Sequence, residues 1–570
     1  MNLRFELSKR FQHTLQLLGI ENANALVFRA SRPEFGDYQV NGVIAAAKHA
    51  GENPRTLAQK VITHNSLNSL PTNLEIAGPG FINVTLDRQY LEQLVEQRPT
   101  IVPTTRPERV VIDYSSPNIA KELHVGHLRS TVIGDAVARM LQLIGHEVIP
   151  QNHVGDWGTS FGKLIAHLDS LSESETQSLS DIERLYVDAS SRFDSDLQFA
   201  NQARSAVTNL QAQRPAEMEI WRRIVSQTIN HMQGIYADLG VLLQRENIRG
   251  ESAYNTELPA VIDDLKGANL LSESDGAKCV YVDGFFKKDG SPLPMIVQKS
   301  DGGYLYHTTD LAAVKHRVNQ LRANRLMYFT DARQIHHFKH LFAVARAVKY
   351  VQDSVELEHL VFGSILNANG APLKSRTGSS ILLSSLIEEG IERARQVIQE
   401  RKSSNREVDP QEIARRIAIS SIKYADLSKN RINDYRFDWD TMLAFEGNTA
   451  PYLLYAYARV CSLFERGKVS ETQCGHNSIK LTEKTERDLA LAILQFQELF
   501  EQSTEERKPH HLCTYLYELT VRFMRFYEQC QILQGTSTVQ QESRLGLCAK
   551  VAEILRTGLQ SLGISVLDRM

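Results

Sequence analysis

The sequence predicts a multidomain α/β protein. We expect a small α+β N-terminal domain, a Rossmann-like parallel-sheet domain with a helical insertion, and a C-terminal all-α helical bundle. Three observations support this prediction. The 570 residues are too many for one hydrophobic core. A β-α-β pattern begins near residue 108, and from about Pro410 onward almost all of the chain has helical periodicity.

The N-terminal part ends in a linker. A helix is expected near Leu7 to Leu18 and a strand over Gly80 to Leu86. The run from Gln97 to Pro107 is rich in proline and threonine, which favours an extended connection. We therefore expect three domains, at residues 1–105, 106–400 and 401–570, with the helical insertion at about 165–260.

The second domain begins with a strand, a helix and a second strand. Val110 to Ile112 is apolar, and apolar residues then recur at spacings of three and four from Leu128 to Ile144. Gly145 ends this helix, and His146 to Ile149 starts the next strand. Such a unit implies a parallel sheet with a right-handed crossover. Further strands are expected at Tyr304 to His307, Leu326 to Phe329 and Leu360 to Phe362.

Composition argues against several classes of protein. With 42% hydrophobic and 23% charged residues, the chain has the balance of an ordinary globular protein. No apolar run reaches about 18 residues and the start lacks an apolar signal segment, so we expect a cytoplasmic protein without a membrane span. Six scattered cysteines favour reduced thiols and no protein-bound zinc or other metal. A net charge of -3 argues against nucleic-acid binding through overall charge and leaves local basic patches open.

The most informative motif lies between the first strand and its helix, in the segment Ser115 to Thr131. Two histidines, His124 and His127, flank Gly126 where the helix begins. A helix N-terminus offers unpaired N–H groups and a partial positive charge, and glycine permits close approach of a ligand. Imidazoles donate hydrogen bonds to phosphate oxygens. The segment therefore predicts an ATP site that stabilises charge on a triphosphate.

A second glycine-rich segment, Asn152 to Gly162, follows the second strand at the edge where α/β sheets bind ligands. Gly155, Asp156 and Gly158 are therefore candidate ATP-binding residues. The alternative is an ordinary turn beside a packed Trp157.

A third group of residues suits a guanidinium, which requires carboxylates together with flat polar or aromatic neighbours. Asp310, Tyr306 four residues earlier, and Asp113 at the end of the first strand supply such groups, and Gln334 adds an amide. The alternative for Asp310 is a helix N-cap or first-turn acid.

Two later segments have a similar choice of interpretation. The loop Ala371 to Gly378 contains Lys374 and Arg376, which are either nucleotide ligands or exposed loop cations. Tyr452, Tyr455 and Arg459 share one helix face, which suits stacking on RNA bases. A tyrosine stripe of this kind is also common in the core of a bundle.

Taken together, these motifs resemble those of arginyl-tRNA synthetases, a family of class I aminoacyl-tRNA synthetases. The resemblance covers nearly the whole chain and includes Ser115 to Lys121, the Gly-Asp-Trp-Gly element, Gly447 to Val460 and the chain end from Gly563. The segment Pro33 to Asn41 is similar to the family's N-terminal domain, which contacts the tRNA elbow.

The resemblance implies a role for each group of residues. The implied catalytic residues are Lys121, His124, Gly126, His127 and Lys374. The implied ATP-binding residues are His124, His127, Gly155, Asp156, Gly158, Phe362, Lys374, Ser375 and Arg376. The implied arginine-binding residues are Asp113, Ser115, Asn118, His127, Tyr306, Asp310 and Gln334. The implied tRNA-binding residues are Tyr38, Gln39, Asn41, Tyr452, Tyr455, Arg459 and Met570.

The second nucleotide signature departs from the class I pattern. Lys374 takes the place of its serine, and Ser375 takes the place of its second lysine. The family's catalytic loop lysine is therefore absent in strict alignment. The resemblance implies that Lys121, just before the histidine motif, compensates for it.

The implied reaction joins ATP and L-arginine into arginyl-adenylate and diphosphate. The arginyl group then passes to the 2′-hydroxyl of the terminal ribose of tRNA(Arg). The resemblance also implies Mg²⁺ accompanying ATP without a dedicated protein cage, tRNA binding before arginine activation, and a monomer.

Three alternatives differ in what they require. A cysteinyl synthetase would hold zinc through cysteines, and no such spacing occurs here. A small-molecule adenylyltransferase would need neither the helical bundle nor the N-terminal domain. A catalytically inactive, synthetase-like protein that only binds tRNA would be expected to lose the two histidines, and both are present.

Overall fold

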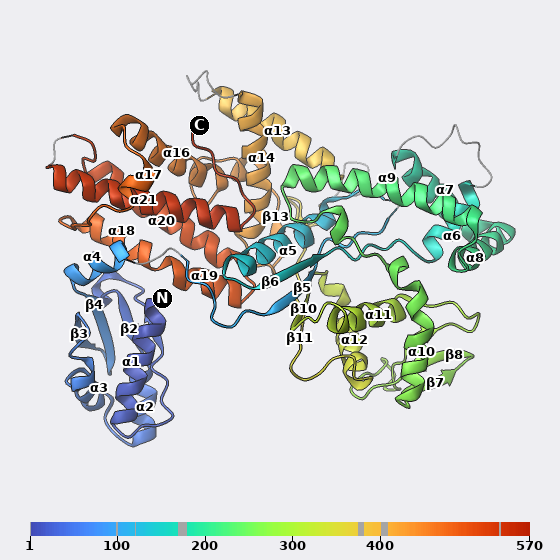
Figure 1. Ribbon diagram of the computed structural model, residues 1–570, viewed down its shortest axis with the longest axis horizontal. Helices are drawn as coiled ribbons and strands as arrows, with labels where there is room; N and C mark the ends of the chain where they lie inside the picture. The colour runs from blue at the N-terminus through green and yellow to red at the C-terminus, as the bar shows by residue number, and fades with distance from the viewer. Residues whose placement is uncertain are drawn as a thin grey trace.

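The computed structural model has three parts in a row (Figure 1). An N-terminal domain lies below one end of a long helical bundle, a parallel sheet lies in the middle, and a helical arm extends at the opposite end. The structure describes residues 2–97, 101–119, 121–168, 179–373, 381–400, 409–534 and 537–570.

The N-terminal domain packs helices against a four-stranded antiparallel sheet with the order β1-β2-β4-β3. The predicted helix and strand are both confirmed, as α1 and β4. Its elements are α1 (Leu3–Leu17), β1 (Val27–Arg29), β2 (Tyr38–Val40), α2 (Gly42–Ala50), α3 (Pro54–Ile62), β3 (Thr72–Ala77), β4 (Phe81–Leu86) and α4 (Arg88–Gln97).

The central sheet has four parallel strands in the order β11-β10-β5-β6. The chain passes from β5 to β6 on one side and later places β10 on the other side of β5. Ligands of such sheets bind where the strand order reverses, at the carboxyl ends of the strands. The site is therefore expected beyond β5 and β10. These strands and their helices are β5 (Arg109–Asp113), α5 (Val125–Leu143), β6 (Glu147–Gln151), α11 (Tyr306–Asn319), β10 (Arg325–Tyr328), α12 (Ile335–Ala347) and β11 (Glu356–His359).

Helices interrupt the sheet between β6 and α11, and α6 to α8 form the arm seen far from the N-terminal domain (Figure 1). A small antiparallel sheet, β7-β8-β9, follows them. The elements are α6 (Thr159–Leu168), α7 (Leu179–Ser195), α8 (Leu197–Gln211), α9 (Pro215–Leu239), α10 (Leu258–Gly267), β7 (Leu271–Ser274), β8 (Ala277–Val280) and β9 (Met295–Gln298).

The C-terminal part is helical apart from β12 (Ile365–Leu366) and β13 (Tyr435–Arg436), which pair with each other. Among the described helices, none is long and apolar enough to cross a membrane. The helices are α13 (Leu383–Glu400), α14 (Pro410–Leu427), α15 (Trp439–Met442), α16 (Ala450–Gly467), α17 (Glu471–Cys474), α18 (Lys484–Leu494), α19 (Phe496–Glu505), α20 (Pro509–Gln529) and α21 (Thr538–Ser561).

Two predicted strands are wrong. Tyr304 to His307 was expected to be a strand, but α11 already begins at Tyr306. The ring of His307 and the hydroxyl of Thr308 hydrogen bond to backbone carbonyls of β9, so this segment starts a helix against the edge of β9. The other case is Leu360 to Phe362, which lies beyond the end of β11 at His359.

A buried lysine joins the bundle to the central domain. Lys423 of α14 donates from Nζ to the carbonyl oxygen of Leu239 (2.8 Å), at the end of α9, and to that of Gly563 (2.6 Å). Burial lowers its pKa to about 8, and the nearby Asp135 of α5 opposes this shift. Helix α5, which begins at the histidine motif, therefore packs close to Gly563 at the end of the bundle.

Candidate active site

The two histidines of the motif cap α5. The backbone N–H of Gly126 donates to Nδ1 of His124 (3.0 Å), and the backbone N–H of His124 donates to Nδ1 of His127 (3.2 Å). The ring centroids are 4.0 Å apart. Because both Nδ1 atoms accept hydrogen bonds, each neutral ring has its proton on Nε2.

The close packing of the two imidazoles explains the charge state of His127 and the need for glycine at position 126. Burial, together with the nearby His124 and Lys121, lowers the pKa of His127 to about 3. His127 is therefore a neutral hydrogen-bond donor at pH 7. A Cβ on Gly126 would lie 2.7 Å from Cε1 of His124, so this position requires glycine.

The loop before α5 is held in a strained conformation by its own hydroxyls. Ser115 and Ser116 have φ angles of +70° and +45°, which residues other than glycine rarely adopt. The Ser115 hydroxyl contacts the hydroxyl of Tyr236 (2.7 Å) and accepts from Thr131 (2.9 Å). The predicted arginine ligand Ser115 is thus engaged within the protein, where it positions the loop.

The glycine-rich segment supports that loop. A Cβ on Gly155 would lie 2.3 Å from Oδ1 of Asn118, so Asn118, which is exposed, lies directly against Gly155. The side chain of Asp156 is buried and accepts from the backbone N–H (2.8 Å) and hydroxyl (2.6 Å) of Ser252. The predicted contact of Asp156 with ATP stays a prediction, and its carboxylate has a structural role. It anchors the segment to the 3₁₀ turn Glu251–Glu257, while Gly158 turns the chain at φ +93°.

Asp113, at the end of β5, has its partners within the protein. Its carboxylate accepts from Nη2 of Arg317 (2.6 Å) and from the hydroxyl of Ser116 (2.5 Å). Both Asp113 and Arg317 are buried. The charge of Asp113 is already balanced, so the geometry does not support the predicted contact with a substrate guanidinium.

Asp310 lies in the first half of α11 between two histidines. Nε2 of His337 is 2.7 Å from Oδ2, and Nε2 of His153 is 3.5 Å from Oδ1. Burial alone would raise the pKa of Asp310, but the hydrogen bonds from His153 and His337 lower it well below its usual range. Asp310 is therefore an anion. Its backbone position inside α11 excludes the N-cap alternative.

An exposed aromatic ring adjoins this anion. Tyr306 begins α11, is 52% exposed, and its ring centroid lies 5.2 Å from that of His337. The backbone N–H of His153 donates to the Ser116 hydroxyl (3.1 Å), which connects the Asp310 group to the loop before α5. The structure thus brings the predicted phosphate and guanidinium sites together.

One candidate residue, Glu251, was missed by the sequence analysis. Burial raises its pKa to about 7; nearby His153 lowers it, while nearby Asp310 and Asp156 raise it. Its carboxylate has no ion-pair partner among the described residues. Glu251 is half-buried, and a half-buried carboxylate beside a second anion favours the approach of a cation. A single glutamate in a loop has no periodicity or motif that would reveal it.

The remaining central residues fall into three groups. In the first group, Gln334 and Lys121 stay predicted substrate contacts. Gln334 is exposed at the end of the 3₁₀ turn Ala332–Gln334, and Nζ of Lys121 lies 4.9 Å from the ring centroid of Tyr186. Phe362 is buried with its ring centroid 6.0 Å from the guanidinium carbon of Arg129, and its contact with ATP stays a prediction. The third group lies outside the described residues and consists of Lys374, Ser375 and Arg376.

The predicted tRNA residues of the N-terminal domain have different environments. Tyr38 is fully buried and donates to Oε2 of Glu498 (3.2 Å), so its predicted contact with a base is wrong. Gln39 is half-buried and donates to Oδ1 of Asn83 (2.8 Å). Asn41 precedes α2 without capping it through its side chain.

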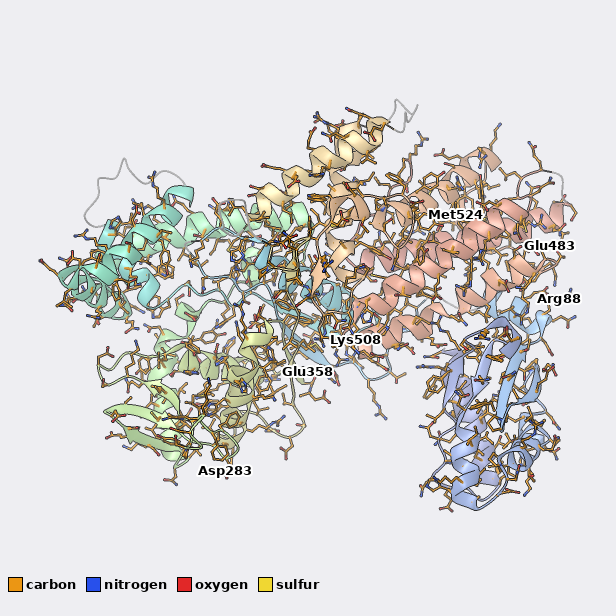
Figure 2. All side chains as sticks on the ribbon, turned by 180° about the vertical axis from the view of Figure 1, so that it is seen from behind. Arg88, Asp283, Glu358, Glu483, Lys508 and Met524 are labelled. Atoms are coloured by element: carbon orange, nitrogen blue, oxygen red, sulfur yellow. The ribbon has the colours of Figure 1, made fainter. Side chains whose placement is uncertain are left out.

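The predicted RNA face of α16 lies at the surface of the bundle. Tyr452, Tyr455 and Arg459 are partly exposed, whereas most other residues of α16 are buried. The guanidinium of Arg459 lies 4.7 Å from the ring centroid of Tyr455, donates to its hydroxyl, and contacts Sδ of Met524 at 3.7 Å. Met524 belongs to α20 of the bundle (Figure 2). Met570 is also partly exposed. These side chains form a cationic and aromatic surface and not a bundle core.

Comparison with known families covers most of the chain. Residues 90–439 match the model described as "tRNA synthetases class I (R), catalytic domain". Residues 6–86 match "Arginyl tRNA synthetase N terminal domain", and residues 453–570 match "DALR anticodon binding domain".

Individual relatives agree over the full length. The arginine–tRNA ligase of Alteromonas mediterranea is 46% identical over 577 residues, and that of an Escherichia coli strain is 44% identical; both alignments cover 100% of each chain. The crystal structure of arginyl-tRNA synthetase from Plasmodium falciparum aligns with a TM-score of 0.86 at 29% identity, covering 100% of this chain and 99% of that chain. Because a catalytic-domain model and full-length relatives both match, this chain belongs to the arginyl-tRNA synthetases of class I.

Proposed function

We propose that the region beyond β5 and β10 is where this arginine–tRNA ligase forms arginyl-adenylate from MgATP and L-arginine. The observation that carries the proposal is the pair of imidazoles at the start of α5, connected through Ser116 and His153 to the anion Asp310. One half of the site suits phosphates and the other suits a guanidinium. An enzyme that joins ATP to arginine needs both.

In the nucleotide half, His124 and His127 present neutral Nε2–H donors beside the N-terminus of α5. The arginine carboxylate attacks the α-phosphorus and diphosphate leaves, so negative charge develops on the phosphate oxygens. Fixed donors and Lys121 stabilise that charge without rearrangement. Lys374, Ser375 and Arg376 remain predicted triphosphate ligands.

In the amino-acid half, we assign the guanidinium to Asp310 and Glu251, with Tyr306 against its face. Among the described residues, Asp310 pairs only with histidines and Glu251 has no ion-pair partner, so the two carboxylates can accept the bidentate donors of arginine. Asp113 is given a different role, because its pairing with Arg317 fixes the loop through Ser116. Asn118 and Gln334, both exposed, remain predicted contacts for the rest of the substrate.

The nucleotide brings its own magnesium in this proposal. The described residues contain no group of three His, Cys, Asp or Glu side chains placed to hold a metal ion. We therefore treat MgATP as the substrate and assign no protein ligand to the ion. We further propose that the protein is cytoplasmic and monomeric. Light scattering of the purified protein tests the monomeric state.

The deciding experiment is arginine-dependent exchange between ATP and labelled diphosphate, with and without tRNA(Arg). Exchange that requires arginine and is not supported by cysteine establishes the activity. A catalytically inactive tRNA-binding protein would bind tRNA(Arg) in a filter assay but show no exchange under either condition. That result would refute the proposed adenylate site.

A further inference from the structure

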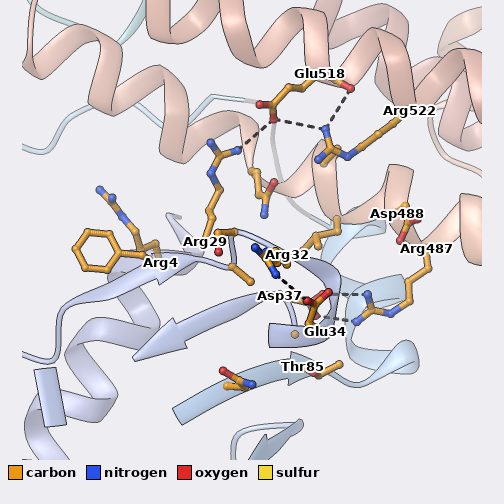
Figure 3. A pocket seen from close by; sticks show the side chains of 18 of the residues that line it. Arg4, Arg29, Arg32, Glu34, Asp37, Thr85, Arg487, Asp488, Glu518 and Arg522 are labelled. Carbon is orange, nitrogen blue, oxygen red and sulfur yellow. Dashed lines mark hydrogen bonds and ion pairs between the residues drawn. The ribbon is translucent and has the colours of Figure 1, made fainter. Parts of the chain in front are cut away.

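A motif that the active site does not use lies where the N-terminal domain meets the bundle. The segment Pro33 to Asn41 is similar to a tRNA-contacting domain, but Asp37 pairs with Arg487 of α18 (Figure 3), and Tyr38 donates to Glu498 of α19. Gly36 and Asp37 border a cleft of about 870 Å³ between the two parts of the molecule. Figure 3 shows the arginines of both walls around this cleft.

An ion pair joins the two walls. Oδ1 of Asp37 accepts from Nη1 of Arg487 (2.9 Å), and Oδ2 accepts from Nη2 (2.7 Å), so the two groups form a bidentate pair. Asp37 is only 5% exposed. We call this contact the Asp37–Arg487 bridge.

The bridge is rigid on the N-terminal side. Oδ2 of Asp37 also accepts from the backbone N–H of Leu86 (2.8 Å), and the backbone N–H of Asp37 donates to the carbonyl of Val84 (2.8 Å). Gly36 permits this turn, because it has a φ of +79° and a Cβ there would lie 2.7 Å from Oγ1 of Thr85. The sequence Gly-Asp therefore serves to aim one carboxylate at α18.

A second buried contact lies next to the bridge. The hydroxyl of the fully buried Tyr38 donates to Glu498 of α19, whose side chain is 2% exposed. Two other ion pairs cross the cleft, and both are longer than the bridge: Arg4 with Glu498 at 3.7 Å, and Arg29 with the more exposed Glu518 at 3.8 Å. A bidentate buried pair fixes orientation, whereas exposed pairs contribute little.

We infer that the Asp37–Arg487 bridge fixes the orientation of the N-terminal domain on the bundle, and thereby sets the tRNA affinity of the enzyme. Asp37 and Arg487 are positioning residues and not RNA ligands. The inference rests on the proposed function, since it assumes that tRNA contacts both the N-terminal domain and the bundle. Two contact regions held at the right separation bind one ligand better than two regions that move independently.

The test compares three variants. Arg487→Gln and Asp37→Asn each break the bridge, and Lys484→Gln is the matched control. Lys484 lines the same cleft from the same helix, but it pairs with Asp488 of that helix and not across the cleft. The control therefore removes one cation from the cleft and leaves the bridge intact.

Orientation is measured by pulsed electron paramagnetic resonance between spin labels at Lys48→Cys on α2 and Val539→Cys on α21, in a Cys461→Ser background. Both labelled positions are exposed, and Cys461 is the one cysteine of the described chain that is not buried. Breaking the bridge should broaden the distance distribution, and Lys484→Gln should not. If the distance distributions of the two bridge variants stay as narrow as that of the labelled protein with the bridge intact, the inference is overturned.

Aminoacylation kinetics give the second readout. Both bridge variants should raise the KM for tRNA(Arg) roughly tenfold, with little change in kcat or in the KM for arginine. If Arg487 instead binds a phosphate directly, Asp37→Asn frees its charge and lowers the KM for tRNA(Arg). That result, or broadened distances with an unchanged KM, would refute the inference. A parent protein without aminoacylation would refute the proposed function and leave the distance measurement valid.

Discussion

Replacing Asp310 by asparagine tests the proposed guanidinium site most directly. The variant keeps the shape of the side chain and an oxygen for the hydrogen bond from His337, but it removes the negative charge. Removing one partner of a desolvated charge pair costs roughly 2–5 kcal/mol, and about 1.4 kcal/mol corresponds to tenfold. Asp310 keeps 21% of its side chain exposed, so the lower half of that range applies. We expect Asp310→Asn to raise the KM for arginine by roughly 10²-fold.

Exchange of ATP with diphosphate, measured over a range of arginine concentrations, provides the assay. Citrulline, a neutral analogue of arginine, adds a second comparison, since the variant should discriminate less between the two. Asp331→Asn is the control, because it removes a carboxylate of similar exposure (29%) that pairs with Arg333. Equal values of KM for arginine in the two variants, or an equally large rise in the KM for ATP, would refute the assignment.

Three further predictions concern the other groups of the site. Lys121→Ala should slow single-turnover formation of arginyl-adenylate by roughly 10²–10³-fold with little change in arginine affinity, and a loss below tenfold would leave the role to the loop cations. Because the carboxyl of Glu251 has a pKa of about 7 and binds a guanidinium only when ionised, kcat/KM for arginine should fall as the pH drops from about 8 to 6. Glu251→Gln should remove that step, and an unchanged pH profile in the variant would contradict the assignment. Tyr455→Ala should raise the KM for tRNA(Arg) by the equivalent of roughly 1–3 kcal/mol, the size of one base stack. A large fall in the melting temperature without any change in tRNA affinity would show instead that Tyr455 only packs the bundle.

Features that depend on neighbouring residues could be predicted from the sequence. The β5-α5-β6 unit follows from local periodicity, and the histidine cap depends on residues within one helical turn. The surface position of Tyr455 and Arg459 follows from helical spacing against an otherwise apolar face.

Features that depend on distant residues could not be predicted. Asp113 was expected to be available because nothing nearby shows that Arg317, more than 200 positions away, pairs with it. Tyr38 was assigned to RNA because its partner Glu498 lies on a helix of the bundle. Glu251 belongs to no pattern, and only its half-buried position near Asp310 marks it.

The buried amine of Lys423 has a consequence for synthesis of the chain. Its two carbonyl partners are separated by more than half of the sequence, and the later one, Gly563, leaves the ribosome long after α5 and the sheet around it. Until Gly563 has been synthesised, the charged amine of Lys423 has only the carbonyl of Leu239 as an acceptor. A buried charge with a missing partner opposes the packing of α14 against α5. Domains emerge from the ribosome in order, but here the support of the first catalytic helix is completed by one of the last residues made. Chains that end before Gly563 are therefore expected not to form arginyl-adenylate, even when every residue that contacts ATP is present.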